Sequence, residues 1–480
     1  MVGIILSVDI GTSSIKAAFI DLDGKLRAYG RAAYARPSPG ANVRDIIAGE
    51  SAAAWEQALT LVLEELHSLA PLCVCDAICI SGNGPTLVPV SSEGEALPPL
   101  YWNDGRTVLP GNNQSQQMPP SFFLPHAAWL KQNSPEEYNK LRFFFSSHEW
   151  LSHRLGADPF TALPSAAYEP YYWDEEQCRL FDMEKSKFPP FVKMGSLAGR
   201  VSAEAALSFG AGKFLKAGTP IVAGAPDFIS ALIGTAVQKP GDVCDRAGSS
   251  EGINVCADSP VKGDGLRKQL LRTQELRPLP HFAEGLWNIG AIIPSSGKLF
   301  DRYRQLSGQE ARPYGELLAE LIPSNGNLDV FRYIEFYPLE EALLSSHSSF
   351  LLPPSSLTLG RSVICSIGFA VREALKALEH AGLKVKEMGV SGGQCKSRLW
   401  NQLKSDICGV SLLVPEIPDA ELAGNAVLAA VALGSASGIE EAIIRMIRFR
   451  DVYEPSQETV SFWEEEFEKF RTQRRQGAKP

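Results

Sequence analysis

A short polar segment follows the first apolar run of the chain, and its residue types could bind a phosphate and a metal ion. It reads Asp9-Ile10-Gly11-Thr12-Ser13-Ser14-Ile15-Lys16. An aspartate at a strand end can hold a hydrated Mg²⁺, a glycine lets the backbone approach an anion, and Thr12 and Ser13 offer donors to phosphate oxygens. Lys16 adds a positive charge. The same residues also fit a solvated hairpin turn, so this chemistry alone leaves both interpretations open.

A second polar turn of the same kind lies in the other half of the chain. Gly248-Ser249-Ser250-Glu251-Gly252 interrupts an apolar run that begins at Val243 and resumes at residues 253–256. The same order of apolar run, polar turn and apolar run occurs at residues 4–20. We therefore predict that the chain contains the same strand-turn-strand arrangement twice. Neither turn is a Walker A loop, because the chain contains no Gly-x4-Gly-Lys-Ser/Thr string.

Strands and helices that could hold these turns alternate along the chain, which predicts an α/β fold. Two apolar runs predict strands on either side of the first turn, and Asp23-Gly24 predicts the next hairpin turn. Further strands are predicted over residues 76–81, 221–223, 243–256 and 387–390, and helices over 52–69, 362–381 and 421–433. Residues 462–473 predict an amphipathic helix packed on the body of the protein, and the charged tract 262–275 predicts a surface loop.

The chain has 480 residues, which suits two domains. We place the boundary near Lys239-Pro240-Gly241, giving domains 1–239 and 240–480. Two α/β halves that each carry a phosphate-sized turn predict a ligand cleft between the domains.

Composition and charge exclude several classes of protein. The net charge of −9 argues against nucleic acid as a partner, and no apolar run is long enough to cross a membrane. The nine irregularly spaced cysteines and the apolar N-terminus, without a signal-peptide pattern, predict a reducing cytoplasm. We interpret Cys73, Cys75 and Cys79 as buried thiols, with a metal site as the alternative. Homodimers are frequent among soluble enzymes in general, so a homodimer is the default expectation for this chain.

Several motifs in order resemble those of the FGGY family of carbohydrate kinases. The resemblance begins at residues 9–24 and covers most of the chain. Its later parts are Ser81-Gly82, Tyr101 to Thr107 with Trp102-x-Asp104-x-Arg106, Pro125 to Asn133, Gly224-Ala225-Pro226-Asp227, Gly248-Ser249-Ser250, Gly392 to Trp400, and Glu421-x-x-Gly424-x-Ala426.

The resemblance implies two ribonuclease H-like, actin-like ATPase domains that close on ATP and a sugar, with transfer of the γ-phosphoryl group to a sugar hydroxyl. By similarity Asp227 is the catalytic base, and Asp9 and Asp227 lie near Mg²⁺. The implied ATP-binding residues are Asp9, Gly11, Thr12, Ser13, Lys16, Gly248, Ser249, Ser250, Gly392, Gly393, Gln394, Ser397 and Asn425. The implied substrate-binding residues are Asn83, Thr86, Trp102, Asp104, Arg106, Asp227 and Phe228.

Ordinary structural roles remain open for some of these residues. Asp227 could cap a loop, and Arg106 could merely fix a neighbouring carboxylate. Trp102 could be a buried aromatic, although an aromatic face suits the C–H surface of a sugar.

The sequence departs from the xylulokinase-like pattern mainly on the acceptor side. Ser81-Gly82-Asn83-Gly84-Pro85-Thr86 lacks the usual Met-His, and Phe228 replaces the polar residue that normally follows the catalytic aspartate. His126 replaces a lysine, Asn425 replaces an alanine, and the second family signature is degenerate. These changes predict a kinase with an unusual acceptor. A non-catalytic sugar or nucleotide sensor is the alternative, followed by another actin-like ATPase.

Overall fold

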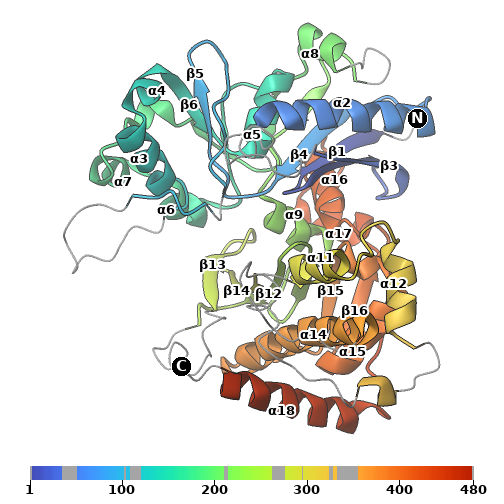
Figure 1. Ribbon diagram of the computed structural model, residues 1–480. Helices are drawn as coiled ribbons and strands as arrows, with labels where there is room; N and C mark the ends of the chain where they lie inside the picture. Colours follow the sequence, from blue (N-terminus) through green and yellow to red (C-terminus); the bar gives the residue numbers. More distant parts are fainter. Residues whose placement is uncertain are drawn as a thin grey trace. The chain divides into compact units, whose positions relative to one another are not determined.

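The computed structural model describes residues 3–34, 51–101, 104–108, 121–209, 215–261, 276–294, 296–323, 328–331 and 355–477. Two compact units form, each around its own sheet (Figure 1). The first unit comprises residues 1–236, 280–284 and 420–447, and the second comprises 237–279, 285–419 and 448–480. The split at 239 expected from the sequence therefore differs at residues 280–284 and 420–447, which pack with the first unit.

The first unit contains a six-stranded sheet in the order β3-β2-β1-β4-β10-β9. Its strands are β1 (Ile4–Ile10), β2 (Ser14–Asp21), β3 (Leu26–Ala33), β4 (Ala77–Gly82), β9 (Leu197–Arg200) and β10 (Pro220–Val222), and two small sheets pair β5 (Val88–Ser91) with β6 (Leu141–Phe145) and β7 (Thr161–Leu163) with β8 (Phe191–Lys193). Its helices are α2 (Ala52–Leu69), α3 (Leu124–Asn133), α4 (Pro135–Lys140), α5 (Ser147–Leu155), α6 (Glu169–Tyr172), α7 (Glu175–Leu180), α8 (Ala203–Ser208), α9 (Asp227–Gly234), α16 (Ala420–Ala432) and α17 (Ile439–Met446), with 3-10 turns η1 (Ala166–Tyr168) and η2 (Lys185–Lys187).

The second unit contains a seven-stranded sheet in the order β13-β14-β12-β11-β15-β16-β17. Its strands are β11 (Val243–Ala247), β12 (Glu251–Ala257), β13 (Arg277–Pro280), β14 (Trp287–Ile293), β15 (Glu387–Gly392), β16 (Ser411–Pro415) and β17 (Phe449–Tyr453). Its helices are α11 (Ser296–Leu306), α12 (Tyr314–Leu321), α14 (Ser356–His380), α15 (Arg398–Cys408) and α18 (Val460–Gly477), with 3-10 turns η3 (Leu328–Phe331) and η4 (Gln394–Lys396).

The two sheets share one plan, which confirms the predicted repeat. In the first unit β3, β2 and β1 are antiparallel neighbours, and β4 and β10 then add in parallel. In the second unit β14, β12 and β11 are antiparallel, and β15 and β16 add in parallel. This five-strand arrangement confirms the α/β, ribonuclease H-like fold expected from the sequence.

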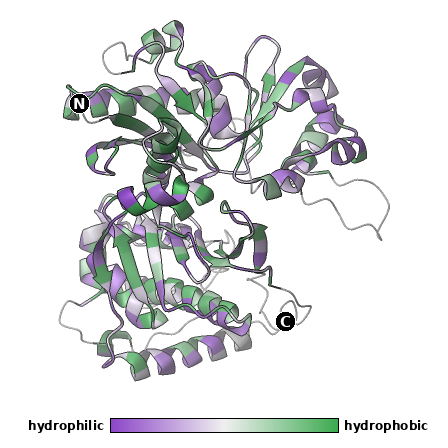
Figure 2. Cartoon of the chain, turned by 180° about the vertical axis from the view of Figure 1, so that it is seen from behind, coloured by the Kyte–Doolittle hydropathy of each residue, from purple (hydrophilic) through white to green (hydrophobic). Residues whose placement is uncertain are grey.

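Most predicted elements form because their apolar spacing matches a buried face. Helix α2 spans the predicted residues and buries Trp55, Leu59, Leu63 and Leu66 against the first sheet. Helix α18 buries Phe462 and Phe467 in the core of the second unit, as expected of an amphipathic helix that packs on the body. Hydrophobic and hydrophilic bands alternate along it in Figure 2. The charged tract 262–275 and Trp102 lie outside the described residues.

Helix α16 joins the first unit although it lies nearly two hundred residues beyond α9 in the chain. The two helices pack side by side (Figure 1), and glycines at the contact permit a close approach. A Cβ on Gly424 would lie 2.0 Å from the Ser230 carbonyl oxygen, and one on Gly234 would lie 1.9 Å from that of Ala420. The small residues of both helices are therefore required by the distance between their backbones. Within the described part of the chain, no helix is both long and apolar enough to cross a membrane.

We expect Gly424→Ala to lower the free energy of unfolding by about 1–3 kcal/mol, because the added methyl group has no space at the α9–α16 contact. Gly315→Ala in the exposed first turn of α12 is the control, since a Cβ there meets nothing within 4 Å. Urea unfolding of both variants measures the difference. Equal stability of the two variants would show that the helices can separate without cost.

Candidate active site

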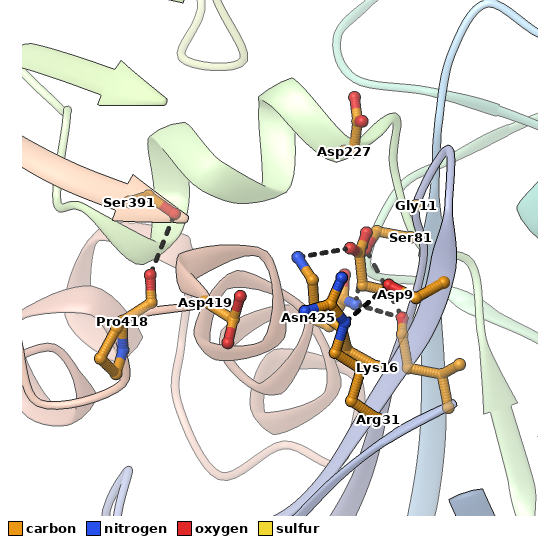
Figure 3. Close-up of polar contacts among 12 residues, drawn as sticks. Asp9, Gly11, Lys16, Arg31, Ser81, Asp227, Ser391, Pro418, Asp419 and Asn425 are labelled. Carbon is orange, nitrogen blue, oxygen red and sulfur yellow. Dashed lines mark hydrogen bonds and ion pairs between the residues drawn. The ribbon is translucent and has the colours of Figure 1, made fainter. Parts of the chain in front are cut away.

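The first predicted turn holds a buried carboxylate at the end of β1. Asp9 is only 2% exposed and stands opposite Lys16 on β2 and Ser81 on β4. Its Oδ1 accepts a hydrogen bond from Ser81 Oγ at 2.8 Å, and its Oδ2 lies 3.4 Å from Lys16 Nζ (Figure 3). The turn that follows exposes Thr12 and Ser13, and the Gly11 amide donates to the Ser14 carbonyl oxygen at 3.0 Å. The turn thus offers exposed donors beside a buried acid.

Burial raises the pKa of Asp9 to about 7. The Lys16 ammonium lowers this pKa, the nearby Glu421 and Asp227 carboxylates raise it, and the Ser81 hydrogen bond lowers it again. The Glu421 and Asp227 carboxylates therefore act on the pKa of Asp9 in the same direction as burial, and the Lys16 ammonium acts against them. A divalent cation bound near Asp9 would favour the ionised form of its carboxylate.

Helix α16 holds the end of β1 in place through Asn425. This side chain has no exposed surface. Its Nδ2 donates to the Val8 carbonyl oxygen at 2.8 Å and to Ser81 Oγ at 3.0 Å, while its Oδ1 accepts from Ser230 Oγ at 2.9 Å. The sequence led us to expect a nucleotide contact here. The structure instead engages the whole amide in bonds to β1, β4 and α9, so we assign Asn425 to the support of Asp9.

Asp227 begins α9 and follows the end of β10 after residues 223–226, and it is 6% exposed. Its Oδ1 accepts a hydrogen bond from the Phe228 amide at 2.7 Å. The preceding Gly224 is fixed against β4, because a Cβ there would lie 1.8 Å from the Ile80 carbonyl oxygen. The ends of parallel strands β1, β4 and β10 thereby bring Asp9, Asn83 and Asp227 to one edge of the sheet, which is where α/β proteins bind their ligands.

The acceptor-side residues expected from the sequence divide into two groups. Asn83 and Thr86 are buried, and neither side chain has a hydrogen-bond partner among the described residues. Asp104 and Arg106 instead bind each other, with Arg106 Nε 2.9 Å from both carboxylate oxygens of Asp104. Burial acts to raise the pKa of Asp104, but the hydrogen bonds and charge of Arg106 lower it overall. The Arg106 guanidinium also lies over the Trp129 ring.

A small cavity lies beside Asp227, between the Gly84-Pro85 loop and the residues on either side of that aspartate, Pro226 and Phe228. His148 also lines it, from the first turn of α5. His148 was not among the residues expected at the site, because one histidine in a helix carries no motif. The only available signal was its place two residues before Trp150, in the helix that packs against the strand ending in Ser81-Gly82.

The second unit carries its two predicted turns at the ends of neighbouring parallel strands. Ala247 of β11 pairs with Gly392 of β15. The Gly392 backbone has φ of +97°, and a Cβ there would lie 2.3 Å from the Ala247 carbonyl oxygen, so only glycine fits. Gly248, Ser249 and Gly393 are exposed, and Ser250 is half-buried. These backbones form an open edge that fits the phosphate and nucleotide roles expected from the sequence.

A buried network of charged side chains supports the first of these turns. Lys404 contacts the carboxylates of both Asp245 and Glu251, and all three residues are at most 2% exposed. Burial raises the pKa of Asp245 against the opposing charge of Lys404. Since Asp245 and Glu251 lie on either side of the Gly248-Ser249-Ser250 turn, their ion pairs with α15 fix both strands that lead into it.

The network continues to the second turn through Gln394. Ser296 Oγ donates to Glu251 Oε2 at 2.5 Å and accepts from Gln394 Nε2 at 2.7 Å. Gln394 Oε1 accepts from Trp400 Nε1 at 3.0 Å. Ser397 Oγ caps α15 by accepting from the Trp400 amide at 3.3 Å. Gln394 and Ser397 were both expected at the nucleotide. In the structure the Gln394 side chain links this turn to Ser296 and Trp400, and the Ser397 side chain caps α15.

Among the described residues, no group of three His, Cys, Asp or Glu side chains is placed to hold a metal ion by itself. A Mg²⁺ ion that is shared with substrate phosphates needs only one or two protein carboxylates. The donor set around Asp9 meets that requirement.

Two repeated α/β units with phosphate-sized turns at their strand ends define the actin-like class of fold. Comparison with known proteins specifies the family. The N-terminal domain of the FGGY family of carbohydrate kinases matches residues 4–234, and its C-terminal domain matches residues 344–433. The chain belongs to the FGGY family.

Individual relatives are distant. An autoinducer-2 kinase of Yersinia enterocolitica is 23% identical over an alignment of 337 residues, which covers 65% of this chain. The chain spans 61% of the length of that kinase. Among solved structures, a ligand-bound xylulose kinase from Lactobacillus acidophilus has a TM-score of 0.74 at 19% identity and covers 98% of this chain and 97% of its own. A Plasmodium falciparum glycerol kinase with ADP has a TM-score of 0.72 at 16% identity, with coverage of 100% and 99%. These structures share the fold.

We expect Lys404→Met to lower the free energy of unfolding by about 3–5 kcal/mol, because it leaves two carboxylates buried without their cation. Lys376→Met is the matched control, since its ion pair with Glu379 is about half exposed and should contribute less than about 1 kcal/mol. Urea unfolding of both variants checks the prediction. A loss for Lys404→Met no larger than that of the control would contradict the network's role.

Proposed function

We propose that the protein is an ATP-dependent kinase that transfers the γ-phosphoryl group of ATP to a hydroxyl of a ketose or a related sugar or polyol. The observation that supports this most is that Asp227 and Asp9 follow neighbouring strand ends of one sheet, and that the Asp227 carboxylate raises the pKa of Asp9. A cavity and an exposed phosphate-type turn lie beside them. Phosphoryl transfer needs these parts, since positioning and charge stabilisation supply most of the catalysis.

Asp227 is the general base of the proposed reaction. It is the first residue of α9. The residues that flank it, Pro226 and Phe228, both line the cavity. An acceptor held in this cavity presents its hydroxyl to the carboxylate, which takes the proton as the oxygen attacks phosphorus.

The exposed turns bind the phosphates of ATP. Thr12 and Ser13 in the first unit, and Gly248, Ser249 and Ser250 in the second, supply amide and hydroxyl donors. Gly392 and Gly393 supply an open backbone for the nucleotide. Asp9, together with Asp227, would hold Mg²⁺, which neutralises charge on the phosphate oxygens when it is bound. Lys16, whose Nζ lies 3.4 Å from Asp9 Oδ2, adds a positive charge beside the turn.

The acceptor side of the site differs from what a pentulose kinase would need. The matched relatives are named for autoinducer-2, xylulose and glycerol, so their names do not agree on one compound. In this chain Phe228 lines the cavity, and its ring cannot form the hydrogen bond that a polar residue would offer. A pentulose that needs this contact should be a poor substrate.

The function is tested by measuring ADP release with ATP and Mg²⁺ across a panel of ketopentoses, ketohexoses, aldoses, polyols and glycerol, with a blank that lacks acceptor. We expect an acceptor-dependent rate for at least one compound. Turnover equal to the blank would indicate an ATPase, and ATP binding without turnover would indicate a sensor.

We expect Asp227→Asn to lower acceptor-dependent ADP release by about 10²–10⁴-fold while ATP still binds, because the amide cannot take the proton. Asp182→Asn is the control, since the Asp182 side chain is 92% exposed. Coupled ADP assays and calorimetric titration with an ATP analogue give the two readouts. Retained turnover in Asp227→Asn would remove the base role from this carboxylate.

A further inference from the structure

A second cation lies beside the first phosphate-type turn, on strand β3. The register of the sheet places Arg31 of β3 directly opposite Lys16 of β2, which in turn stands opposite Asp9 of β1. Directly paired residues of antiparallel strands share one face of a sheet, with their Cβ atoms about 5 Å apart. Figure 3 shows the Arg31 side chain alongside that of Lys16. None of the ATP-binding residues implied by the family resemblance lies on β3.

The pairing of Arg31 with Lys16 is unfavourable by itself. Like charges directly opposite each other repel, so the pair costs stability unless an anion lies beside it. The other arginine of β3 differs in this respect, since Arg27 Nε lies 2.9 Å from Asp21 Oδ2. Among the described residues, no carboxylate forms an ion pair with the Arg31 guanidinium, and Glu65 accepts only from the Arg31 backbone amide, at 3.2 Å.

One hydrogen bond holds the Arg31 guanidinium at the turn. Its Nε donates to Ser14 Oγ at 2.9 Å, and Ser14 is the 2% exposed residue that begins β2 directly after the turn. The end of β3 is also tied to the turn, because the Tyr34 amide donates to the Ser13 carbonyl oxygen at 3.1 Å. Arg31 itself is exposed, and its two terminal nitrogens have no hydrogen-bond partner among the described residues.

We propose that Arg31 is a further phosphate-binding residue, whose two terminal guanidinium nitrogens donate to oxygens of the ATP phosphate chain. The planar pair of N–H donors matches phosphate oxygens, and the bond to Ser14 fixes the plane beside Thr12 and Ser13. A bound polyphosphate also removes the cost of placing Arg31 opposite Lys16. The inference rests on the proposed kinase function and adds a residue to its phosphate site.

Calorimetric titration with a non-hydrolysable ATP analogue tests the proposal. Arg31→Gln should weaken binding about 10- to 100-fold, because hydrogen bonds to a charged group are lost. Arg31→Lys keeps the charge but not the planar donor pair, so it should recover part of the loss. Arg179→Gln is the matched control, since Arg179 is also exposed and its Nε also donates to one local oxygen, the Glu175 carbonyl. Equal affinities of the wild type and Arg31→Gln would overturn the assignment.

Urea unfolding without nucleotide separates a binding role from a structural one. Arg31→Gln loses the bond to Ser14 but relieves the repulsion with Lys16, so we expect the same midpoint as in the wild type. A lower midpoint that accompanies weaker ATP-analogue binding would show that Arg31 only supports the fold, and would overturn the proposal.

A double-mutant cycle tests the role of Ser14 in positioning the guanidinium. Ser14→Ala should weaken binding of the ATP analogue about 2- to 10-fold by itself, because it removes one hydrogen bond. In the Arg31→Gln background it should have no further effect, since Ser14 then has no guanidinium to hold. Additive losses would overturn the placement of Arg31 at the turn by Ser14.

Binding of the analogue does not require phosphoryl transfer, so the outcomes also separate this proposal from the kinase function. Weaker binding by Arg31→Gln, in a protein whose wild type shows no acceptor-dependent ADP release, would support the role of Arg31 and contradict the kinase function. ADP release by the wild type, with unchanged binding by Arg31→Gln, would overturn the role of Arg31 alone. A wild type that binds no ATP analogue would overturn both.

Discussion

The close contact between helices α9 and α16 is the constraint on which the first unit's site depends. Glycine at positions 234 and 424 lets the two backbones touch, and no larger residue fits. The contact brings Asn425 under β1 and β4, places Glu421 near Asp9, and fixes the helix that Asp227 begins. Helix α16, from the last quarter of the chain, therefore packs in the first unit, most of which comes from residues 1–236. Packing between distant segments, rather than the local turn alone, places the acids together.

In the second unit, buried ion pairs rather than close glycine contacts fix the elements that carry the site. Lys404 on α15 neutralises carboxylates on the two strands that lead into its exposed turn, and Ser296 and Gln394 extend the network to the next turn. Buried ion pairs add little net stability compared with apolar packing, but they hold a fixed geometry because a displaced partner would leave a charge buried alone. Rigid support suits a loop whose backbone amides must point at a phosphate.

The sequence predicted what depends on local pattern. The strand-turn-strand around residues 4–21, helix α2 and the repeat of the plan at Val243 follow from apolar spacing and turn residues, and the structure has all three. It did not predict the roles of Asn425 and Gln394, because Asn425's partners on β1, β4 and α9 lie about 200 to 400 residues earlier in the chain, and Gln394 pairs with Ser296 as well as with nearby Trp400. His148 could not be found, since its significance comes from an unpartnered position in a cavity that only the fold creates.

Under the proposed function, the γ-phosphoryl group passes to an acceptor hydroxyl held beside Asp227. Phosphorus NMR of a reaction with ATP, Mg²⁺ and acceptor tests it most directly, because it identifies the phosphorylated product. We expect a new phosphate monoester signal that grows in proportion to ADP and is absent without acceptor. Inorganic phosphate as the sole product beside ADP would contradict it, since the phosphoryl group would then have gone to water.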